Sequence, residues 1–307
     1  MKHLVVAAMA TMVGAWLEGA PAQSRVFVGS TPCGDSIRAL LGVPRDVKAD
    51  LIEWELTLND PGNAGAPSTY DLRYRVGMTL PNQPGLGSAA SRLERRGTWR
   101  TGTGIRSQPA ATVVELDGAV ALVKVSDTIL HVLEPDRTLM VGDGGWSYTL
   151  SRRDAAERAV DAALAAADSG DGPRTTSRAT GPSVFGIFDG RTPCQGIARE
   201  LRIPARPGCW KAKWRVTLFH DPKTHEPTTY RLEGTLYGRR PREGSWRIVK
   251  GIPAHSDAEV YELAAGNGEA PALLLKGDDR VLFFLDRERR PLTGNAGNAY
   301  TLDRREP

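Results

Sequence analysis

The sequence predicts two tandem antiparallel β-barrels, joined by an alanine-rich helix and a flexible linker. Three observations lead to this fold class. Short stretches alternate apolar and polar residues, which is the period of a strand with one buried face. Gly, Pro and Asp separate these stretches, as the turns of an all-β domain require. The same series of landmarks also occurs twice along the 307 residues, so each half is expected to fold as one domain.

Each half begins with a strand that runs into a Thr-Pro-Cys turn. This run covers Gly29 to Cys33 in the first half and Gly190 to Cys194 in the second. A Gly and a Pro this close interrupt regular pairing, because Gly tolerates positive φ and Pro lacks an N–H donor. Residues 35–41 and 195–201 then have the pattern of short helices. We expect each of these helices to plug or cap one end of a barrel.

The later landmarks follow in the same order in both halves. Strictly alternating strands surround Trp54 and Trp214, and each half closes with Tyr-Thr-Leu. A shared order this long indicates internal duplication. The other pairs are Thr-Tyr-x-Leu at 69–72 and 229–232, Gly-x-Trp at 97–99 and 244–246, apolar strands at 114–116 and 261–263, and apolar strands at 129–133 and 281–285.

The repeat places the two barrels at residues 23–153 and 183–307. Between them, residues 154–168 are rich in alanine and have strong helix propensity, with Asp154 suited to the N-cap. Residues 169–182 combine Ser, Gly, Thr, Arg and Pro without apolar periodicity, which is typical of a flexible linker.

Residues 1–22 have the pattern of a cleaved secretory signal peptide. Lys2 and His3 precede an apolar run at 4–17, and Ala20 to Ala22 provide the small residues that a signal peptidase recognises. The run is too short for a membrane span, and no Cys lies at the cleavage site to carry a lipid. We therefore expect an exported, periplasmic protein that neither spans the membrane nor carries a lipid anchor.

Export would expose Cys33, Cys194 and Cys209 to an oxidising compartment. Their odd number leaves at least one thiol without a partner inside the chain. The preferred disulfide pair is Cys194 with Cys209, because both lie in one domain. A bridge between Cys33 and Cys194 and a thiolate metal site remain the alternatives.

The ordered landmarks resemble the N-terminal domain of the NlpE family of envelope-stress and copper-resistance lipoproteins. That family combines Gly-x-x-Pro-Cys-x-x-Cys-x-Gly-Ile with later Thr-Tyr-x-Leu, Gly-x-Trp and Tyr-x-Leu strands. The resemblance covers most of both halves and implies a lipocalin-like barrel, present twice. The chain departs from the family at the second cysteine, which is replaced by Ser36 and Ile197. The lipid-anchoring Cys of the family is also missing.

This resemblance implies copper or stress homeostasis in the cell envelope, by binding or sensing and not by catalysis. Copper and zinc need converging thiolate or imidazole ligands. The densest group surrounds the turn between His220 and His225, and an exposed polar loop is the other interpretation of that turn. His131 lies on an apolar strand and is expected on the surface. The metal-ligand candidates are Cys33, Cys194, Cys209, His220 and His225.

Two other functions remain open on the sequence alone. One is a carrier of a small apolar ligand or lipid, held at one barrel mouth by an apolar face that includes Trp54, Leu56 and Tyr70 or their counterparts in the second copy. The other is a thiol redox partner that uses Cys33 and Cys194. Each needs a feature that only the folded chain can show: an open barrel mouth, or an accessible thiol.

The sequence gives little support for hydrolysis or nucleic-acid binding. It contains neither a Gly-x-Ser-x-Gly nor a His-Glu-x-x-His motif. Its net charge is only +4, and the basic turn at 239–242 has no interleaved aromatic residues. Glu53 and Glu55 occupy positions where the second copy has Lys213 and Arg215. These opposite charges suggest either that one barrel docks on the other or that chains associate head to tail.

Overall fold

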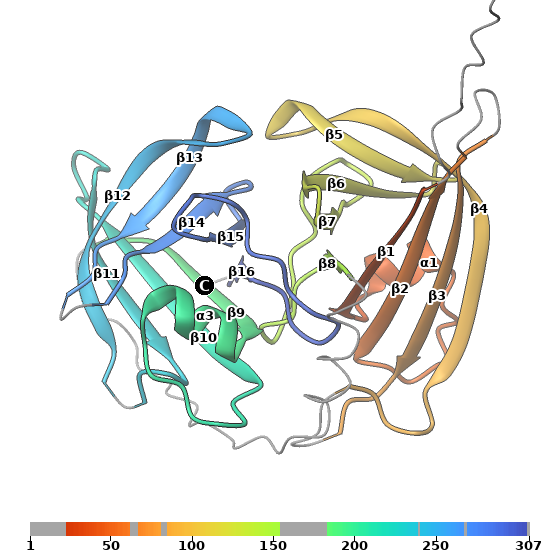
Figure 1. Cartoon of the computed structure of the whole chain (residues 1–307), viewed down its shortest axis with the longest axis horizontal. Coiled ribbons are helices and arrows are strands. Elements are labelled where there is room, and N and C mark those ends of the chain that lie inside the picture. Colours follow the sequence, from red (N-terminus) through yellow and green to blue (C-terminus); the bar gives the residue numbers. More distant parts are fainter. Residues whose placement is uncertain are drawn as a thin grey trace, which may run out of the picture.

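The computed structural model describes residues 23–61, 67–80, 85–153, 183–238, 240–266 and 269–305. Within these residues the chain forms two closed antiparallel β-barrels that lie side by side (Figure 1). The predicted fold class and the internal duplication are therefore confirmed. The predicted signal peptide at 1–22, the helix at 154–168 and the linker at 169–182 lie outside the described residues.

In both barrels each strand pairs with the next one along the chain, and the last strand closes on the first. The first barrel consists of β1 (Gln23–Pro32), β2 (Leu51–Asp60), β3 (Thr69–Gly77), β4 (Ser91–Ile105), β5 (Gln108–Leu116), β6 (Val120–Ser126), β7 (Ile129–Val132) and β8 (Thr149–Arg152). The second consists of β9 (Val184–Pro193), β10 (Lys211–His220), β11 (Pro227–Gly234), β12 (Arg242–Ile252), β13 (His255–Leu263), β14 (Ala272–Lys276), β15 (Val281–Leu285) and β16 (Thr301–Arg304).

The repeated Gly-x-Thr-Pro-Cys run is explained by contacts inside each barrel. A Cβ atom on Gly29 would lie 2.7 Å from the Thr149 carbonyl oxygen, so only glycine fits where β1 approaches β8. A Cβ atom on Gly190 would likewise come too close to the Thr301 carbonyl oxygen of β16. Two positions later, the fully buried Thr31 hydroxyl accepts a 2.8 Å hydrogen bond from the Trp54 indole.

A short helix follows the turn in each copy, as the sequence predicts. These helices are α1 (Asp35–Leu41) and α3 (Cys194–Leu201). Each packs its apolar face into the barrel core, through Ile37 and Leu41 in α1 and through Ile197 and Leu201 in α3. They therefore plug one end of each barrel, while alternating strand residues fill the interior.

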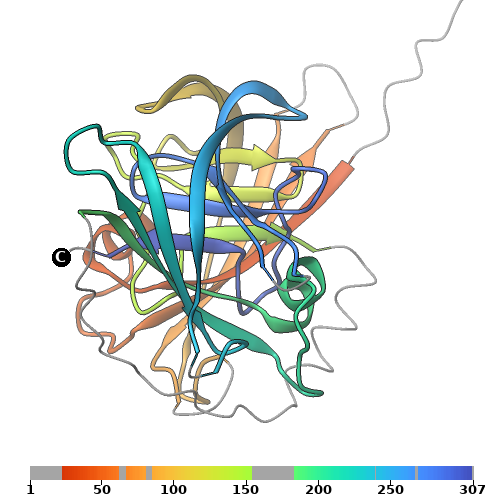
Figure 2. The same ribbon diagram turned by 90° about the vertical axis from the view of Figure 1, so that its left-hand side faces the viewer.

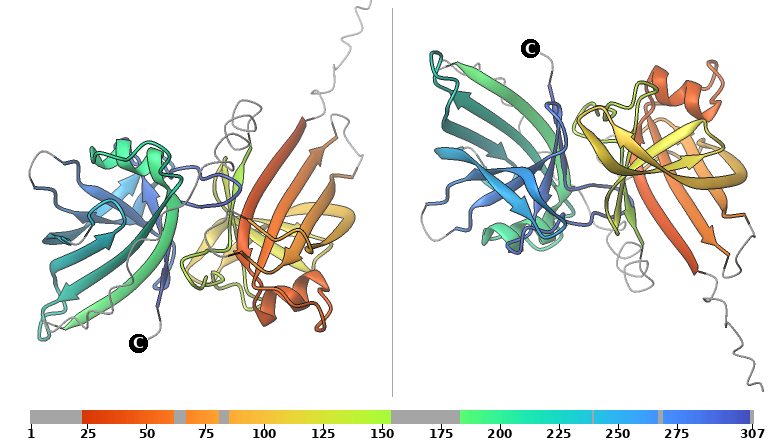
Figure 3. Two further views of the ribbon diagram at one scale, coloured as in Figure 1. Left: turned by 90° about the horizontal axis from the view of Figure 1, so that it is seen from below. Right: turned by 90° about the horizontal axis from the view of Figure 1, so that it is seen from above.

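A third apolar cluster joins the two barrels. It combines Val113, Val123 and Leu139 of the first barrel with Val260, Val281 and Phe283 of the second, among others. Figure 3 shows the later strands of each barrel facing one another. The inter-barrel interface is therefore a packed core, which removes apolar surface from water as a domain core does.

Polar contacts across the interface follow an approximate twofold symmetry. The hydroxyls of Thr149 and Thr301, at equivalent positions, lie 2.9 Å apart. The Gly142 amide donates to Asp303 at 2.8 Å, and the Gly294 amide donates to Ser151 at 2.9 Å. Both barrels thus contribute corresponding atoms to one interface.

The expected surface position of His131 is wrong. Its side chain does point out of the first barrel, but the second barrel covers it, and the residue is fully buried. Its ring nitrogens lie 2.9 Å from the Thr149 hydroxyl and from the Met140 carbonyl oxygen, and its ring contacts Phe283 edge-on. Burial lowers the pKa of His131 to about 4.

The predicted docking through opposite strand charges is also wrong, because the inter-barrel core uses other strands. Glu53 pairs with Arg75 within the first barrel at 2.8 Å. Arg215 pairs with Asp189 within the second barrel, also at 2.8 Å. These charges therefore link neighbouring strands within each barrel.

Two hairpins rise at the same end of the molecule, one from each barrel. They are β4–β5 and β12–β13, and both bend over the inter-barrel interface (Figure 1 and Figure 2).

Among the described residues, no helix has the length and apolar character needed to cross a membrane.

Candidate functional site

The three cysteines predicted as metal ligands do not come together, because Cys33 lies in one barrel and Cys194 and Cys209 lie in the other. Cys194 and Cys209 form a disulfide bond that ties the first residue of α3 to the loop before β10. Cys33 is a buried free thiol in the other barrel, and burial raises its pKa. A raised pKa disfavours the thiolate, which is the form that attacks disulfides and binds metals.

The two histidines of the predicted metal site do come together. His220 ends β10 and His225 lies in the following turn, with their ring centroids 5.3 Å apart. However, no group of three or more His, Cys, Asp or Glu side chains converges as a metal site among the residues that the structure describes. His220 and His225 are thus a pair on a surface turn.

The apolar face proposed for a carrier is part of the first barrel's core. Trp54, Leu56 and Tyr70 are each at most 3% exposed and belong to the cluster that fills the barrel. A ligand at this position would have to displace them.

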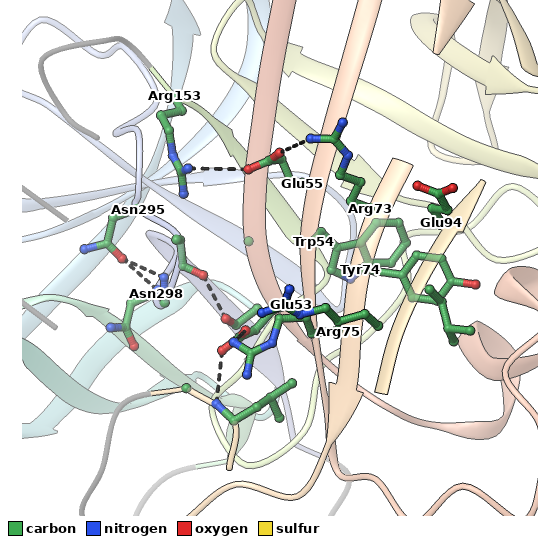
Figure 4. Close-up of a pocket in the computed structure, with 18 of the residues that line it drawn as sticks. Glu53, Trp54, Glu55, Arg73, Tyr74, Arg75, Glu94, Arg153, Asn295 and Asn298 are labelled. Carbon is green, nitrogen blue, oxygen red and sulfur yellow. Dashed lines mark hydrogen bonds and ion pairs between the residues drawn. The ribbon is translucent and has the colours of Figure 1, made fainter. Parts of the chain in front are cut away.

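A groove of about 750 Å³ lies between the outer surface of the first barrel and a loop of the second. Strands β2, β3 and β4 form its floor, and residues 295–298 with Trp210 form the opposite wall. We call this space the charged groove (Figure 4). Its volume falls within the range of small-molecule sites.

The strand register places the charges of this groove in cross-strand rows. In one row, Glu53 lies opposite Arg75, which lies opposite Arg92. In the next row, Glu55 lies opposite Arg73, and Figure 4 shows Glu55 between Arg73 and Arg153. These two contacts of Glu55 are 3.6 and 3.7 Å long, too long for hydrogen bonds.

The first row contains more positive than negative charge. Both carboxylate oxygens of Glu53 are occupied, by Arg75 and by the Leu86 amide. Arg92 has no hydrogen-bond or ion-pair partner among the described residues. Two like charges directly opposite each other destabilise a sheet, so this row favours an added anion.

The groove also contains hydrogen-bond donors without acceptors. Nε of Arg75, Nε of Arg153 and Nε1 of Trp210 are buried and have no partner in the structure. Because buried polar groups in proteins are usually paired, three unpaired donors around one groove indicate a missing acceptor. Water or a ligand with several oxygen atoms would supply it.

The loop of the second barrel is held firmly against the groove. The Asn295 carboxamide oxygen accepts from the amides of Gly297 and Asn298, at 3.0 and 2.9 Å. The Ser30 hydroxyl of β1 donates to the Ala296 carbonyl oxygen at 2.8 Å. The opposite wall is therefore preformed and does not need to order on binding.

The sequence analysis singled out Glu53 and Glu55 for inter-barrel docking, but it did not identify the arginines of the groove or its opposite wall. Arg75 and Arg92 are far apart in the chain, and only the strand register shows that they are neighbours. Trp210 and Asn295 come from the other barrel, whose placement depends on the inter-barrel core. The one available signal was the alternating charge on strands whose other face is apolar.

Comparison with known proteins identifies no relative of this chain. No family model matches it, no curated protein matches its sequence, and no solved structure matches its fold. The resemblance to the NlpE family therefore stays a prediction from the landmarks, and the functional argument depends on the geometry.

Proposed function

We propose that this chain is an exported, non-catalytic binding protein whose charged groove takes up a small anion that carries carboxylate or phosphate oxygens. One observation carries the proposal: the groove has more donors and positive charges than its own acceptors can satisfy. Four arginines and three glutamates line it, and three of its N–H groups lack partners, two of them on these arginines and one on Trp210. Charge-assisted hydrogen bonds to a carboxylate or phosphate group would satisfy them.

Binding is favoured over catalysis because the carboxylates of the groove are engaged with arginines. Glu53 and Glu55 each contact two donors or cations, and Glu94 lies 3.6 Å from Arg96. The groove supplies positioned cations, which suit recognition.

Export is supported by the signal-like N-terminal sequence and by the disulfide between Cys194 and Cys209, because such bonds persist in oxidising compartments. A role in copper or envelope-stress homeostasis remains a prediction from the family resemblance. Among the described residues, no three or more His, Cys, Asp or Glu side chains converge as a metal site.

The proposal is tested by titrating the full chain with citrate and with pyrophosphate in a calorimeter. These probes carry carboxylate and phosphate oxygens respectively, so they distinguish the two sources of negative charge. We expect one of them to bind, and Arg92→Gln to weaken that binding about tenfold, the cost of one lost charge-assisted hydrogen bond.

The matched control is Arg100→Gln, because Arg100 lies on the same strand but pairs with Glu115, and neither residue lines the groove. It should leave the affinity within twofold of the original. The proposal fails if neither anion binds, or if the two substitutions weaken binding equally.

A further inference from the structure

A second opening lies between the bent hairpins β4–β5 and β12–β13. It has a volume of about 1340 Å³, and we call it the hairpin cleft. Its floor is apolar and includes Val123, Leu139 and Phe283 from the inter-barrel core. Residues of both hairpin tips line its sides, and Figure 1 shows the two tips facing each other.

Each wall of the cleft contains a stretch of strand with an unpaired edge. β13 pairs with β14 only from Val260 onward, so residues 255–259 have no ladder partner on that side. β5 likewise pairs with β6 only from Val113 onward, which leaves residues 108–112 without one. An unpaired edge offers N–H and C=O groups to any extended chain that enters the cleft.

The two edges differ in how they are protected. A glycine with positive φ shapes each hairpin, Gly104 in one and Gly251 in the other. A Cβ atom added at Gly104 or Gly251 would lie 3.3 Å from the carbonyl oxygen of Pro109 or Ser256 respectively, so these two residues occupy equivalent positions. Pro109 has no N–H donor, whereas Ser256 retains one, beside the register shift between Lys250 and Ile252 in the β12–β13 pairing.

The β13 edge is also negatively charged where the β5 edge is neutral. Asp257 and Glu259 stand at the positions equivalent to Ala110 and Thr112. Glu259 pairs with Lys276 at 3.1 Å, and Asp257 has no ion pair among the described residues. Six acidic and four basic side chains line the cleft, in a chain with a net charge of +4.

We propose that residues His255–Glu259 of β13 accept an extended basic peptide as an added strand in the hairpin cleft. The backbone of the peptide would pair with the free β13 edge, which is the mode of recognition known as β-augmentation. Its basic side chains would meet Asp257 and Glu259, and its apolar side chains would lie over Ala258 and the cleft floor. Opposite charges on facing strands stabilise such pairing.

The acidic residues also explain why a free edge is tolerated. Two copies of this chain that approached edge to edge would bring Asp257 and Glu259 against their own counterparts. Like charges at such positions prevent self-association of edge strands. The same charges therefore select against a second copy and in favour of a basic partner.

The test uses the full chain and a fluorescein-labelled nonapeptide of alternating lysine and valine, followed by fluorescence anisotropy. We expect saturable binding, and at least a tenfold weaker affinity in Ser256→Pro, because proline removes a donor from the edge. The matched substitution Pro109→Ser, on the opposite wall, should change the affinity by less than twofold. Asp257→Lys should weaken binding by a similar factor to Ser256→Pro.

The position of Ser256 is expected to tolerate proline, since the equivalent position already holds Pro109. If Ser256→Pro nevertheless fails to fold, a peptide with N-methyl groups on alternate residues tests the same pairing from the ligand side. The proposal is overturned if the N-methylated peptide binds as well as the parent, or if a glutamate–valine peptide of equal length does. It is also overturned if folded Ser256→Pro retains full affinity.

Discussion

The two barrels have the same residues at positions that stabilise the fold. They differ at positions that line the charged groove and the hairpin cleft. The indole of Trp54 donates to Thr31, and that of Trp214 donates to Thr192, both at 2.8 Å. The difference between Pro109 and Ser256, in contrast, leaves one hairpin edge blocked and the other open. Duplication supplies two copies of one scaffold, and one copy can then change without loss of the common core.

The same contrast appears at the inter-barrel interface and around the short helices. Ser151 in the first barrel corresponds to Asp303 in the second, and each accepts a hydrogen bond from a glycine amide of the other barrel. Ala49 corresponds to Cys209, so only the second barrel has its helix fixed by a disulfide. Substitutions at three sets of equivalent positions test whether the two barrels respond alike: the shared glycines, the disulfide, and Asp303.

The largest loss of stability is expected after substitution of the glycine that both barrels share, Gly29 and Gly190. Gly29→Val and Gly190→Val each place a branched side chain against the backbone of the closing strand, where a Cβ on Gly29 already approaches the Thr149 carbonyl oxygen to 2.7 Å. Each should lower the free energy of unfolding by more than about 3 kcal/mol, because the backbone cannot move away within a closed barrel. Urea denaturation followed by circular dichroism measures this.

Gly266→Ala is the control for the glycine substitutions. A Cβ at this position meets no atom within 4 Å, so stability should change by less than about 0.5 kcal/mol. Equal losses at Gly29 and Gly190 would support equivalence of the two barrels. A neutral Gly190→Val would show that the second barrel closes differently from the first.

The sequence predicts the common scaffold well because the scaffold depends on local patterns. Strand alternation around Trp54, the turn at Thr31 and the apolar face of α1 are each visible within a few residues. Their repetition then makes the interpretation stronger, since each half predicts the other. The fold class, the duplication and the two short helices therefore follow from the residues alone.

The candidate sites could not be predicted in the same way, because they depend on long-range placement. The period-2 pattern correctly places His131 on the outer face of its strand, yet that face is covered by the second barrel. The excess charge at Arg92 appears only when the register of β3 and β4 is known. A residue pattern predicts the faces of one strand at a time. The charged groove and the hairpin cleft each combine residues of both barrels, so such patterns do not predict them.

The second prediction concerns the disulfide, which only the second barrel has. Cys194→Ser with Cys209→Ser opens a loop of 15 residues and should cost about 3 kcal/mol of stability. Hydrogen–deuterium exchange should become faster in α3 and remain unchanged in α1. Cys33→Ser provides the control at the equivalent position, and faster exchange in α1 after the double substitution would contradict the assignment to one barrel.

The smallest change in stability is expected after substitution of Asp303, and it should depend on pH. One of its carboxylate oxygens accepts from Gly142 and the other is buried without a partner, and burial raises the pKa of Asp303 to about 8. The folded chain therefore retains a proton that the unfolded chain releases near pH 3.8. His131 acts in the opposite direction, since its pKa falls from 6.5 to about 4 on folding.

These two shifts cancel between about pH 4 and 6.5, because the folded chain gains a proton on Asp303 and loses one on His131. Between pH 6.5 and 8 only Asp303 contributes, and stability should fall by about 1.4 kcal/mol per pH unit at most as the pH rises. Asp303→Asn, or Asp303→Ser as in the first barrel, should remove this fall. Urea denaturation at pH 6.5 and pH 8 measures the slope, with the exposed Asp257→Asn as control. If Asp303→Asn keeps the slope of the original chain, the carboxyl of Asp303 does not carry the pH dependence of the inter-barrel interface.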